Sequence, residues 1–290
     1  MRIIEEIDEM IETARGWLTR GSVGFIPITN ELSMHAGHQA LLVTAREHCE
    51  ITVVCLLRTP LSFDASSDTT MSIHSLEESL RLLTASDVDV VFTPRWEDLF
   101  PAAYATYIRL GGSIQEALVP AHCTDNALNE FATALGQLLL IVRPDIAFLG
   151  QKDAIQAAII HKIIHDLHID VSLRLTPTVR EQNGLAMSSH MLLLNPQERE
   201  AATLLHNCLL LCKNSIERGV DDAPTLTQLV HTYIAGNEHI TLLHLLIGDP
   251  ETLQARDKVI PGTLLALKAR VGKNLVNDNI QWMLDGSWRL

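Results

Sequence analysis

Apolar segments of five to eight residues alternate with longer segments of helical periodicity over roughly the first 175 residues. The apolar segments cover residues 23–27, 50–57, 88–92, 146–150 and 171–175, of which residues 50–57 are rich in β-branched residues. The expected helices lie between them, over residues 36–49, 75–85, 126–142 and 152–167. Near-continuous apolar strands separated by helices are typical of a parallel sheet with helices on both faces. The sequence therefore predicts an α/β fold, with a doubly wound, Rossmann-like parallel-sheet domain over residues 1–175.

The first segment of the chain has the spacing of an amphipathic helix. Apolar residues recur at helical intervals from Ile3 to Leu18, and Gly21 follows as a natural stop. A helix is therefore expected to open the chain.

The pattern changes after Thr176. A loop reaches Asn195, a helix is expected from Pro196, and a second helical segment covers residues 225–235. Three strand candidates then follow one another closely, at residues 239–247, 263–270 and 274–280. Strands in close succession without long helices between them indicate an antiparallel sheet. We expect a smaller α+β domain over residues 176–290, packed against the first domain and closing an active-site cleft.

The acidic balance of the chain restricts its partners. Asp and Glu number 35 against 22 Lys and Arg, which gives a formal net charge of −13 at pH 7. Sequence-independent nucleic-acid binding needs clustered Lys and Arg, so no nucleic-acid partner is expected. The first residues do not resemble a signal peptide, and no apolar stretch reaches 18 residues. We expect a cytoplasmic protein that does not enter a membrane.

The five cysteines do not suggest a disulfide framework. They are odd in number, contain no CxxC pair, and stand at Cys49, Cys55, Cys123, Cys208 and Cys212. Reduced, buried thiols are the favoured interpretation. Cys208 and Cys212 are one helical turn apart, so a shared metal ion is an alternative, although no second ligand pair has matching spacing.

Polar loops after two of the expected strands carry residue types suited to phosphate chemistry. In open α/β sheets ligands collect at the carboxyl ends of strands, where helix N-termini present unpaired N–H groups. After residues 23–27, His35 and His38 flank Gly37 at the start of a helix. After residues 146–150, Gly150 is followed by Lys152 and Asp153. Incidental histidines and a solvated helix terminus are the alternative interpretations.

A third loop, VREQNGLAMSSHM, covers residues 179–191 at the expected domain junction. Its paired hydroxyls, Ser188 and Ser189, can donate to phosphate oxygens, and residues 184–187 can line an adenine pocket with backbone groups. Serine pairs also serve as caps or turns. The conjunction of three such loops carries more weight than any one of them.

The order and spacing of these motifs resemble the pantoate-beta-alanine ligase (pantothenate synthetase) family. That family, one of the HIGH-motif nucleotidyltransferase-like group, typically has PTMGALHxGH, GEKD and VREADGLAMSSRN segments. The counterparts here are PITNELSMHAGH from Pro27, GQKD from Gly150 and VREQNGLAMSSHM from Val179. DPETL, LLALKARVG and DNI continue the resemblance in the C-terminal part, so that it spans about residues 3–280.

The resemblance implies an activity and its small-molecule partners. In the family, ATP and pantoate form an enzyme-bound pantoyl adenylate with release of pyrophosphate. Beta-alanine then attacks the adenylate to give pantothenate and AMP. The same resemblance implies Mg2+ bridging the ATP phosphates, with no protein metal ligand assigned, and a homodimer.

The resemblance also implies roles for individual residues. The implied catalytic residues are His35, His38 and Lys152. The implied ATP-binding residues are Pro27, Thr29, His35, Gly37, His38, Gly150, Lys152, Asp153, Val179, Met187, Ser188, Ser189 and His190. The implied acid-binding residues are Ser62, His122 and Gln156.

Departures from the family pattern are concentrated where the acid is expected to bind. Ser62 stands where the family has a glutamine, Val119 where it has an arginine, and His190 replaces a second arginine. The first loop is also two residues longer. Two alternatives to the pantoate reaction therefore stay open: a related ATP-dependent amide ligase for another acid and amine, and a nucleotide-binding relative with impaired turnover.

One further motif, HKIIHDLH, places His161, His165 and His168 on one side of an expected helix. Such spacing can ligate zinc. The motif lacks the glutamate of HExxH, and a solvated face is the favoured interpretation.

Overall fold

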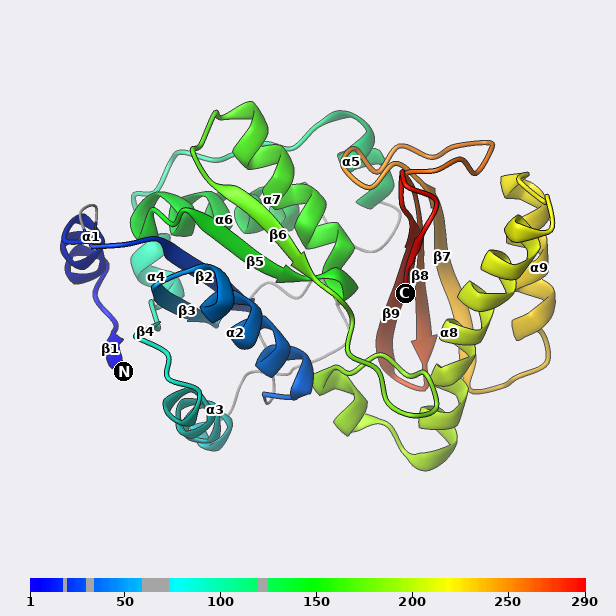
Figure 1. Cartoon of the computed structure of the whole chain (residues 1–290), viewed down its shortest axis with the longest axis horizontal. Helices are drawn as coiled ribbons and strands as arrows, with labels where there is room; N and C mark the ends of the chain where they lie inside the picture. The colour runs from blue at the N-terminus through cyan, green and yellow to red at the C-terminus, as the bar shows by residue number, and fades with distance from the viewer. Residues whose placement is uncertain (18–19, 30–33, 59–72, 119–124) are drawn as a thin grey trace. The chain divides into compact units, whose positions relative to one another are not determined.

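The computed structural model describes residues 1–17, 20–29, 34–58, 73–118 and 125–290 (Figure 1). The chain divides into two compact units. The first unit comprises Met1–Leu110, Cys123–Gly150 and Ile159–Thr176, and the second comprises Gly111–His122, Gln151–Ala158 and Pro177–Leu290. Residues 111–118 and 151–158 thus belong with the C-terminal part of the chain, whereas the sequence-based division at residue 175 grouped them with the N-terminal part.

A six-stranded parallel sheet organises the first unit, in the order β1-β4-β3-β2-β5-β6. The strands are β1 (Arg2–Ile4), β2 (Val23–Thr29), β3 (Ile51–Leu57), β4 (Val90–Phe92), β5 (Ile146–Gly150) and β6 (Ser172–Thr176). The helices are α1 (Ile7–Arg15), α2 (Ala36–His48), α3 (Ile73–Ala85), α4 (Trp96–Leu99), α6 (Asp125–Val142) and α7 (Ala154–Asp166), of which α7 begins in the second unit.

The central strands are apolar throughout because both of their faces are covered. Ile26 of β2 and Val54 of β3 are fully buried and pack in one cluster with Leu41 and Leu42 of α2. Helices lie in front of and behind this sheet in Figure 1. The predicted doubly wound α/β class is confirmed for this unit.

The start of the chain differs from its prediction. Residues Arg2–Ile4 form a parallel edge strand against Val90–Phe92, and the helix begins only at Ile7. Ile4 is 1% exposed, while the backbone N–H of Arg2 donates to the carbonyl oxygen of Asp89 at 2.8 Å. The apolar spacing of these first residues fits a helix or a strand, so pairing with the distant strand β4 decides which of the two forms.

A four-stranded antiparallel sheet, in the order β10-β9-β8-β7, organises the second unit. Its strands are β7 (Ile240–Gly248), β8 (Thr263–Val271), β9 (Asn274–Trp282) and β10 (Trp288–Arg289). Its helices are α5 (Gly112–Leu118), α8 (Pro196–Glu217) and α9 (Ala223–Ile234), with short 3-10 helices η2 (Gln151–Asp153) and η3 (Ser189–Leu193). The antiparallel α+β character predicted for the C-terminal part is confirmed.

Helix α8 begins where its capping residues predict. The Asn195 side chain accepts from the Glu198 N–H at 2.9 Å, and the Glu198 carboxylate accepts from the Asn195 N–H at 3.0 Å. This reciprocal cap, with Pro196 in the first turn, satisfies N–H groups that otherwise lack partners. Helices α8 and α9 cover one face of the sheet (Figure 1), which leaves the other face for β9 to contact η2.

Buried thiols contribute to the core under α8. Cys208 and Cys212 are fully buried among apolar residues of this helix, α9 and the sheet. Burial raises the pKa of the Cys208 thiol to about 12 and that of Cys212 to about 11, so both thiols are neutral near pH 7. Cys49 and Cys55 are also buried free thiols, while Cys123 lies outside the described residues. Among the described helices, none is long and apolar enough to cross a membrane.

The edge strand at the N-terminus can be tested with neighbouring isoleucines. Ile4→Ala should lower the free energy of unfolding by about 2–5 kcal/mol because it leaves a cavity in a buried site. Ile3 is 45% exposed on the same strand, so Ile3→Ala should change the free energy of unfolding by less than about 0.5 kcal/mol. Urea unfolding followed by circular dichroism measures both. Equal effects of the two substitutions would contradict the pairing of β1 with β4.

Candidate active site

The first candidate loop follows the central strand β2. Pro27 and Thr29 lie in this strand, paired in register with Cys55 and Leu57 of β3. Thr29 is the last strand residue and stands at the carboxyl edge of the parallel sheet, where ligands collect in this class of fold. Residues 30–33 lie outside the described part of the chain, and α2 begins at Ala36.

His35 and His38 form a reciprocal cap at the start of α2. The Gly37 N–H donates to His35 Nδ1 at 3.1 Å, and the His35 N–H donates to His38 Nδ1 at 3.2 Å. The ring centroids are 4.0 Å apart. An Nδ1 atom that accepts carries no proton, so in each neutral ring Nε2 is the donor. Two ring donors therefore accompany the positive end of the helix dipole, an arrangement suited to an anion.

Gly37 is required by this arrangement. A Cβ atom at this position would lie 2.8 Å from Cε1 of His35, closer than real Cβ atoms approach. Any side chain at position 37 would displace the His35 ring from its cap. The absence of a side chain at Gly37 therefore lets the His35 ring, and a ligand, lie close to the backbone.

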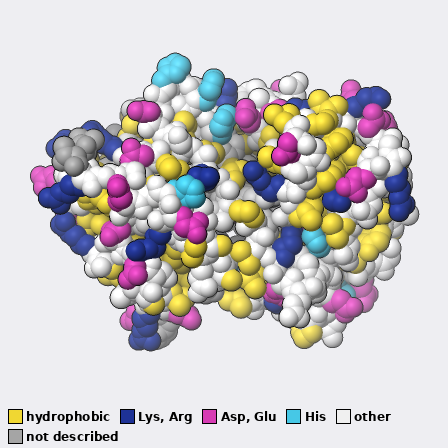
Figure 2. Space-filling model, viewed as in Figure 1, with side chains coloured by type: hydrophobic (Ala, Val, Ile, Leu, Met, Phe, Trp, Pro, Cys, Tyr) yellow, Lys and Arg dark blue, Asp and Glu magenta, His cyan; other side chains and the backbone are white. Residues whose placement is uncertain are grey.

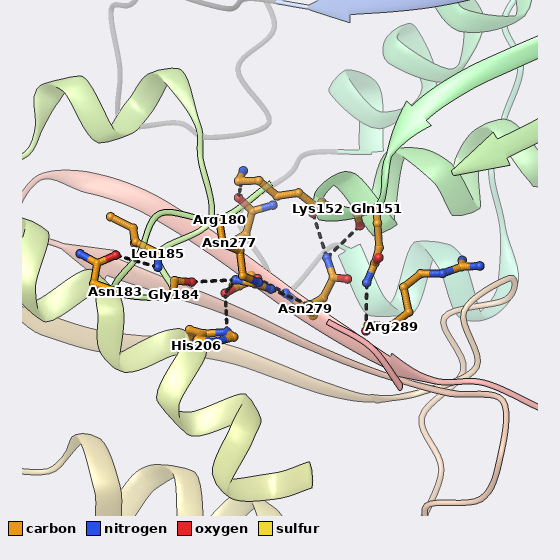
Figure 3. A network of polar contacts seen from close by, with 11 residues as sticks. Gln151, Lys152, Arg180, Asn183, Gly184, Leu185, His206, Asn277, Asn279 and Arg289 are labelled. Atoms are coloured by element: carbon orange, nitrogen blue, oxygen red, sulfur yellow. Dashed lines mark hydrogen bonds and ion pairs between the residues drawn. The ribbon is translucent and has the colours of Figure 1, made fainter. Parts of the chain in front are cut away.

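The second candidate loop begins where β5 ends at Gly150. Residues Gln151–Asp153 form the 3-10 helix η2, and α7 starts at Ala154, two residues later than the sequence predicted. Lys152 Nζ donates to Asn277 Oδ1 of β9 at 3.0 Å (Figure 3). Lys152 and Asp153 are partly exposed, as is Gln156 in the first turns of α7.

The backbone of η2 is also attached to β9. The Asn279 amide nitrogen donates to the carbonyl oxygens of Gln151 at 3.0 Å and Lys152 at 2.9 Å (Figure 3). The Gln151 side chain in turn donates to the carbonyl oxygen of Arg289 at 3.1 Å. Asn279 and Gln151 are each 2% exposed, so these bonds are shielded from water. The position of Lys152 is therefore fixed at both its backbone and its ammonium group.

The third candidate loop is closed by a buried ion pair. Arg180 donates from two nitrogens to the two carboxylate oxygens of Asp278, at 2.7 and 2.9 Å. It also donates to the carbonyl oxygen of Gly184 at 3.1 Å (Figure 3). The side chains of Arg180 and Asp278 are 13% and 4% exposed. The Met187 N–H donates to the carbonyl oxygen of Val179 at 2.9 Å, which brings the two ends of the loop together.

Gly184 and His206 pack against each other inside this loop. Gly184 has a φ of +87°, and a Cβ atom there would lie 2.3 Å from Cδ2 of His206. Burial lowers the pKa of His206, as does the Arg180 charge, while Asp278 partly opposes both. His206 is therefore neutral near pH 7, and Arg180 and Asp278 supply the two charges at this point.

Ser189 begins the 3-10 helix η3, and Ser188 directly precedes it. Ser189 is 1% exposed, whereas Ser188 is partly exposed, and the Met191 N–H donates to the carbonyl oxygen of Ser188 at 3.1 Å. Arg199 of α8 donates to the carbonyl oxygen of Met191 at 3.1 Å and pairs with Glu181. Helix α8 thus anchors both sides of the serine segment.

The structure describes only some of the predicted site residues. Ser62, Val119 and His122 lie outside the described residues, as does the side chain of His190. Conversely, Arg180, Asp278 and Asn279 had no predicted role, although all three lie within the motifs named above, and Asn277 lies in no motif. Their functions depend on contacts between segments about a hundred residues apart, which local patterns do not reveal.

The histidines of the HKIIHDLH motif lie at the surface. Figure 2 shows a group of histidine side chains over the end of α7, where His165 is 73% exposed and 3.1 Å from Asp166. The interpretation as a solvated face agrees with this exposure. Across the described ranges, no group of three or more His, Cys, Asp or Glu side chains could hold a metal ion.

Comparisons with known proteins extend over nearly the whole chain. The family model described as pantoate-beta-alanine ligase matches residues 2–281. The pantothenate synthetase of Heliobacterium modesticaldum is 36% identical over 97% of this chain and 99% of its own length. That of Koribacter versatilis is 31% identical over 100% of this chain and 98% of its own.

Solved structures show the same fold. The crystal structure of pantothenate synthetase from Thermus thermophilus has a TM-score of 0.85 and 28% identity, covering 98% of this chain and 100% of that one. The Francisella tularensis pantoate-beta-alanine ligase, crystallised with beta-gamma ATP and beta-alanine, has a TM-score of 0.72 at 22% identity and covers 96% and 97% of the two chains. This chain belongs to the pantoate-beta-alanine ligase family.

Proposed function

We propose that this chain is a carbon-nitrogen ligase that condenses pantoate with beta-alanine at the expense of ATP. The pantoate carboxylate attacks the α-phosphorus of ATP, which forms the acyl adenylate and releases pyrophosphate. The beta-alanine amine then attacks the acyl carbon, and AMP leaves. The family match over residues 2–281 carries this proposal. The geometry of the described loops supports it.

His35 and His38 have the chemistry to bind ATP phosphates. Both Nδ1 atoms accept backbone N–H groups, so each neutral ring carries its proton on Nε2, at the start of α2. These donors and the helix dipole favour negative charge, which grows on the phosphates as pyrophosphate leaves. Pro27, Thr29 and Gly37 are proposed to line the same phosphate and nucleotide region.

Lys152 is the proposed cation for the leaving pyrophosphate. Its backbone and its ammonium group are both held by β9, so little reorganisation accompanies the reaction. Gly150 is proposed to allow close approach of ATP, and Asp153 to hold the ribose. Gln156 is proposed to contact the acid, together with Ser62 and His122.

The third candidate loop forms a hairpin in which Arg180 is bridged to Ala186, and this hairpin presents the remaining proposed nucleotide contacts. Val179 and Met187 border the nucleotide in this proposal, and Ser188 and Ser189 donate to phosphate. His190 follows them as a candidate donor. The Met187 N–H donates to the Val179 carbonyl oxygen, and the neighbouring Arg180 is held by its buried ion pair, which favours a defined geometry over a mobile loop.

Mg2+ is the proposed metal, held mainly by ATP itself. Magnesium typically binds phosphate oxygens and water with one or two carboxylates, without an all-protein cage. The described residues contain no such cage, and Asp153 is the nearest carboxylate in sequence to Lys152. A single carboxylate beside Lys152 would suit a metal that is bound mainly by ATP and offsets phosphate charge. A homodimer and a cytoplasmic location are further proposals that rest on the family resemblance.

An acid panel tests the proposed reaction. Purified protein with ATP and Mg2+ should release pyrophosphate when pantoate is added, and should form pantothenate when beta-alanine is added as well. With other carboxylic acids the rate of pyrophosphate release should be at least about tenfold lower, because the pocket forms hydrogen bonds that match its own substrate. Pyrophosphate release with a different acid, and none with pantoate, would instead support a related amide ligase, the possibility raised by Ser62 and Val119. ATP binding with no release for any acid would identify an impaired relative.

Replacement of Lys152 tests the placement of the phosphates. Lys152→Ala should lower the rate of pyrophosphate release by about 100-fold or more, because it removes a preorganised charge. Lys162→Ala is the matched control, since Lys162 lies further along α7 and pairs with Asp166 at the surface. Its rate should stay within about twofold of the wild type. A fully active Lys152→Ala enzyme would remove Lys152 from the mechanism.

Chelation tests the proposed role of Mg2+. EDTA should abolish pyrophosphate release, and excess Mg2+ should restore it, because the metal offsets the phosphate charge. The circular dichroism spectrum should not change, since the metal is proposed to arrive with ATP. Loss of secondary structure on chelation would indicate a structural metal and contradict this assignment.

A further inference from the structure

A row of polar side chains crosses one face of the antiparallel sheet in the second unit. His244 of β7 pairs with Lys268 of β8, and Lys268 pairs with Asn277 of β9. Directly paired residues in antiparallel strands have Cβ atoms about 5 Å apart on the same face. Asn277 in turn accepts a hydrogen bond from Lys152 Nζ at 3.0 Å. We call these four residues the sheet strip.

The sheet strip lies on the face that α8 and α9 do not cover. The core residues Leu265 and Leu267 of β8 and Val276 of β9 point toward the helices, so Lys268 and Asn277 point the other way. The side chains of Lys268, Asn277 and His244 are all partly exposed. A ligand therefore needs no rearrangement of the core to reach the strip.

Two of the four residues in the sheet strip, Lys152 and Lys268, are lysines. Burial lowers the pKa of His244, and the neighbouring Lys268 lowers it further, so the imidazole is neutral near pH 7. Asn277 is an uncharged amide. It accepts a bond from Lys152 without cancelling the charge, as an aspartate at this position would.

We propose that Lys268 is a second cation for the ATP phosphates, and that Asn277 positions Lys152 beside it without neutralising either lysine. The inference rests on the proposed function, because it assigns Lys268 to the ATP that Lys152 of the same unit is proposed to bind. A lysine ammonium has three donors, of which Asn277 uses one on Lys152. Lys268 binds the phosphate chain in the ground state, while Asn277 keeps Lys152 oriented for the departure of pyrophosphate.

Charge removal at Lys268 is the first test. Lys268→Gln should weaken ATP binding about tenfold in calorimetry without the acid, with kcat for pyrophosphate release within about threefold of the wild type. Lys268→Arg should restore most of the affinity because it keeps the charge. Arg270→Gln is the matched control, since Arg270 is exposed two residues along on the same face of β8. It should change the affinity less than about twofold.

Substitution of Asn277 is the second test. Comparing the effects of an aspartate and a leucine on kcat separates a role in charge from a role in structure. Asn277→Asp keeps an acceptor for Lys152 but adds a negative charge, so kcat should fall about 100-fold and ATP binding should weaken. Asn277→Leu removes the bond without adding charge and should lower kcat only about tenfold. Asn274→Asp, on the same strand, controls for added charge. Melting temperatures near that of the wild type verify that all variants fold.

The outcomes distinguish this inference from the proposed function. An active wild-type enzyme whose Lys268→Gln and Asn277→Asp variants bind ATP normally and turn over normally would overturn the inference alone. A milder effect of Asn277→Asp than of Asn277→Leu would assign Asn277 a structural role and overturn its positioning role. A wild-type protein that releases no pyrophosphate with any acid, yet loses ATP affinity in both variants, would overturn the proposed reaction and support the strip.

Discussion

The buried ion pair between Arg180 and Asp278 is the contact on which the geometry of the second unit depends. Removing one partner of such a pair costs about 3–5 kcal/mol, because the other charge stays buried alone. Here both carboxylate oxygens are used, and Arg180 also holds the Gly184 carbonyl of the hairpin. The hairpin that precedes Ser188 and Ser189 is therefore attached to the sheet by charge as well as by backbone bonds.

Strand β9 carries this pair on one face and the contacts to Lys152 on the other. Side chains alternate along a strand, so Asp278 points toward Arg180 and α8 while Asn277 and Asn279 point toward η2. Three consecutive residues thus fix two loops that are distant in sequence. A shift of one residue in the β8–β9 register would exchange these faces and release both loops, which makes the register of β9 a functional property.

The sequence predicted the fold class and most of its elements because buried parallel strands and capped helices have strong local signals. Asn195 and Pro196 marked the start of α8 correctly. The strand Arg2–Ile4 was missed because its apolar spacing also fits a helix, and only its partner β4 distinguishes the two. Asn277 and Lys268 were missed for a related reason: an amide and a lysine on a strand acquire meaning from cross-strand neighbours, which no local pattern specifies.

The whole chain carries a net negative charge, whereas the charged members of the sheet strip are both lysines. A net charge of −13 disfavours a polyanionic ligand over most of the surface. Screening limits such effects to about 8–10 Å at physiological salt, so residues near the ligand decide its affinity. Asn277 contacts both Lys152 and Lys268 as an uncharged amide, and His244 beside Lys268 is a neutral imidazole. An acidic protein can therefore bind a triphosphate if the polar residues between its few cations are neutral.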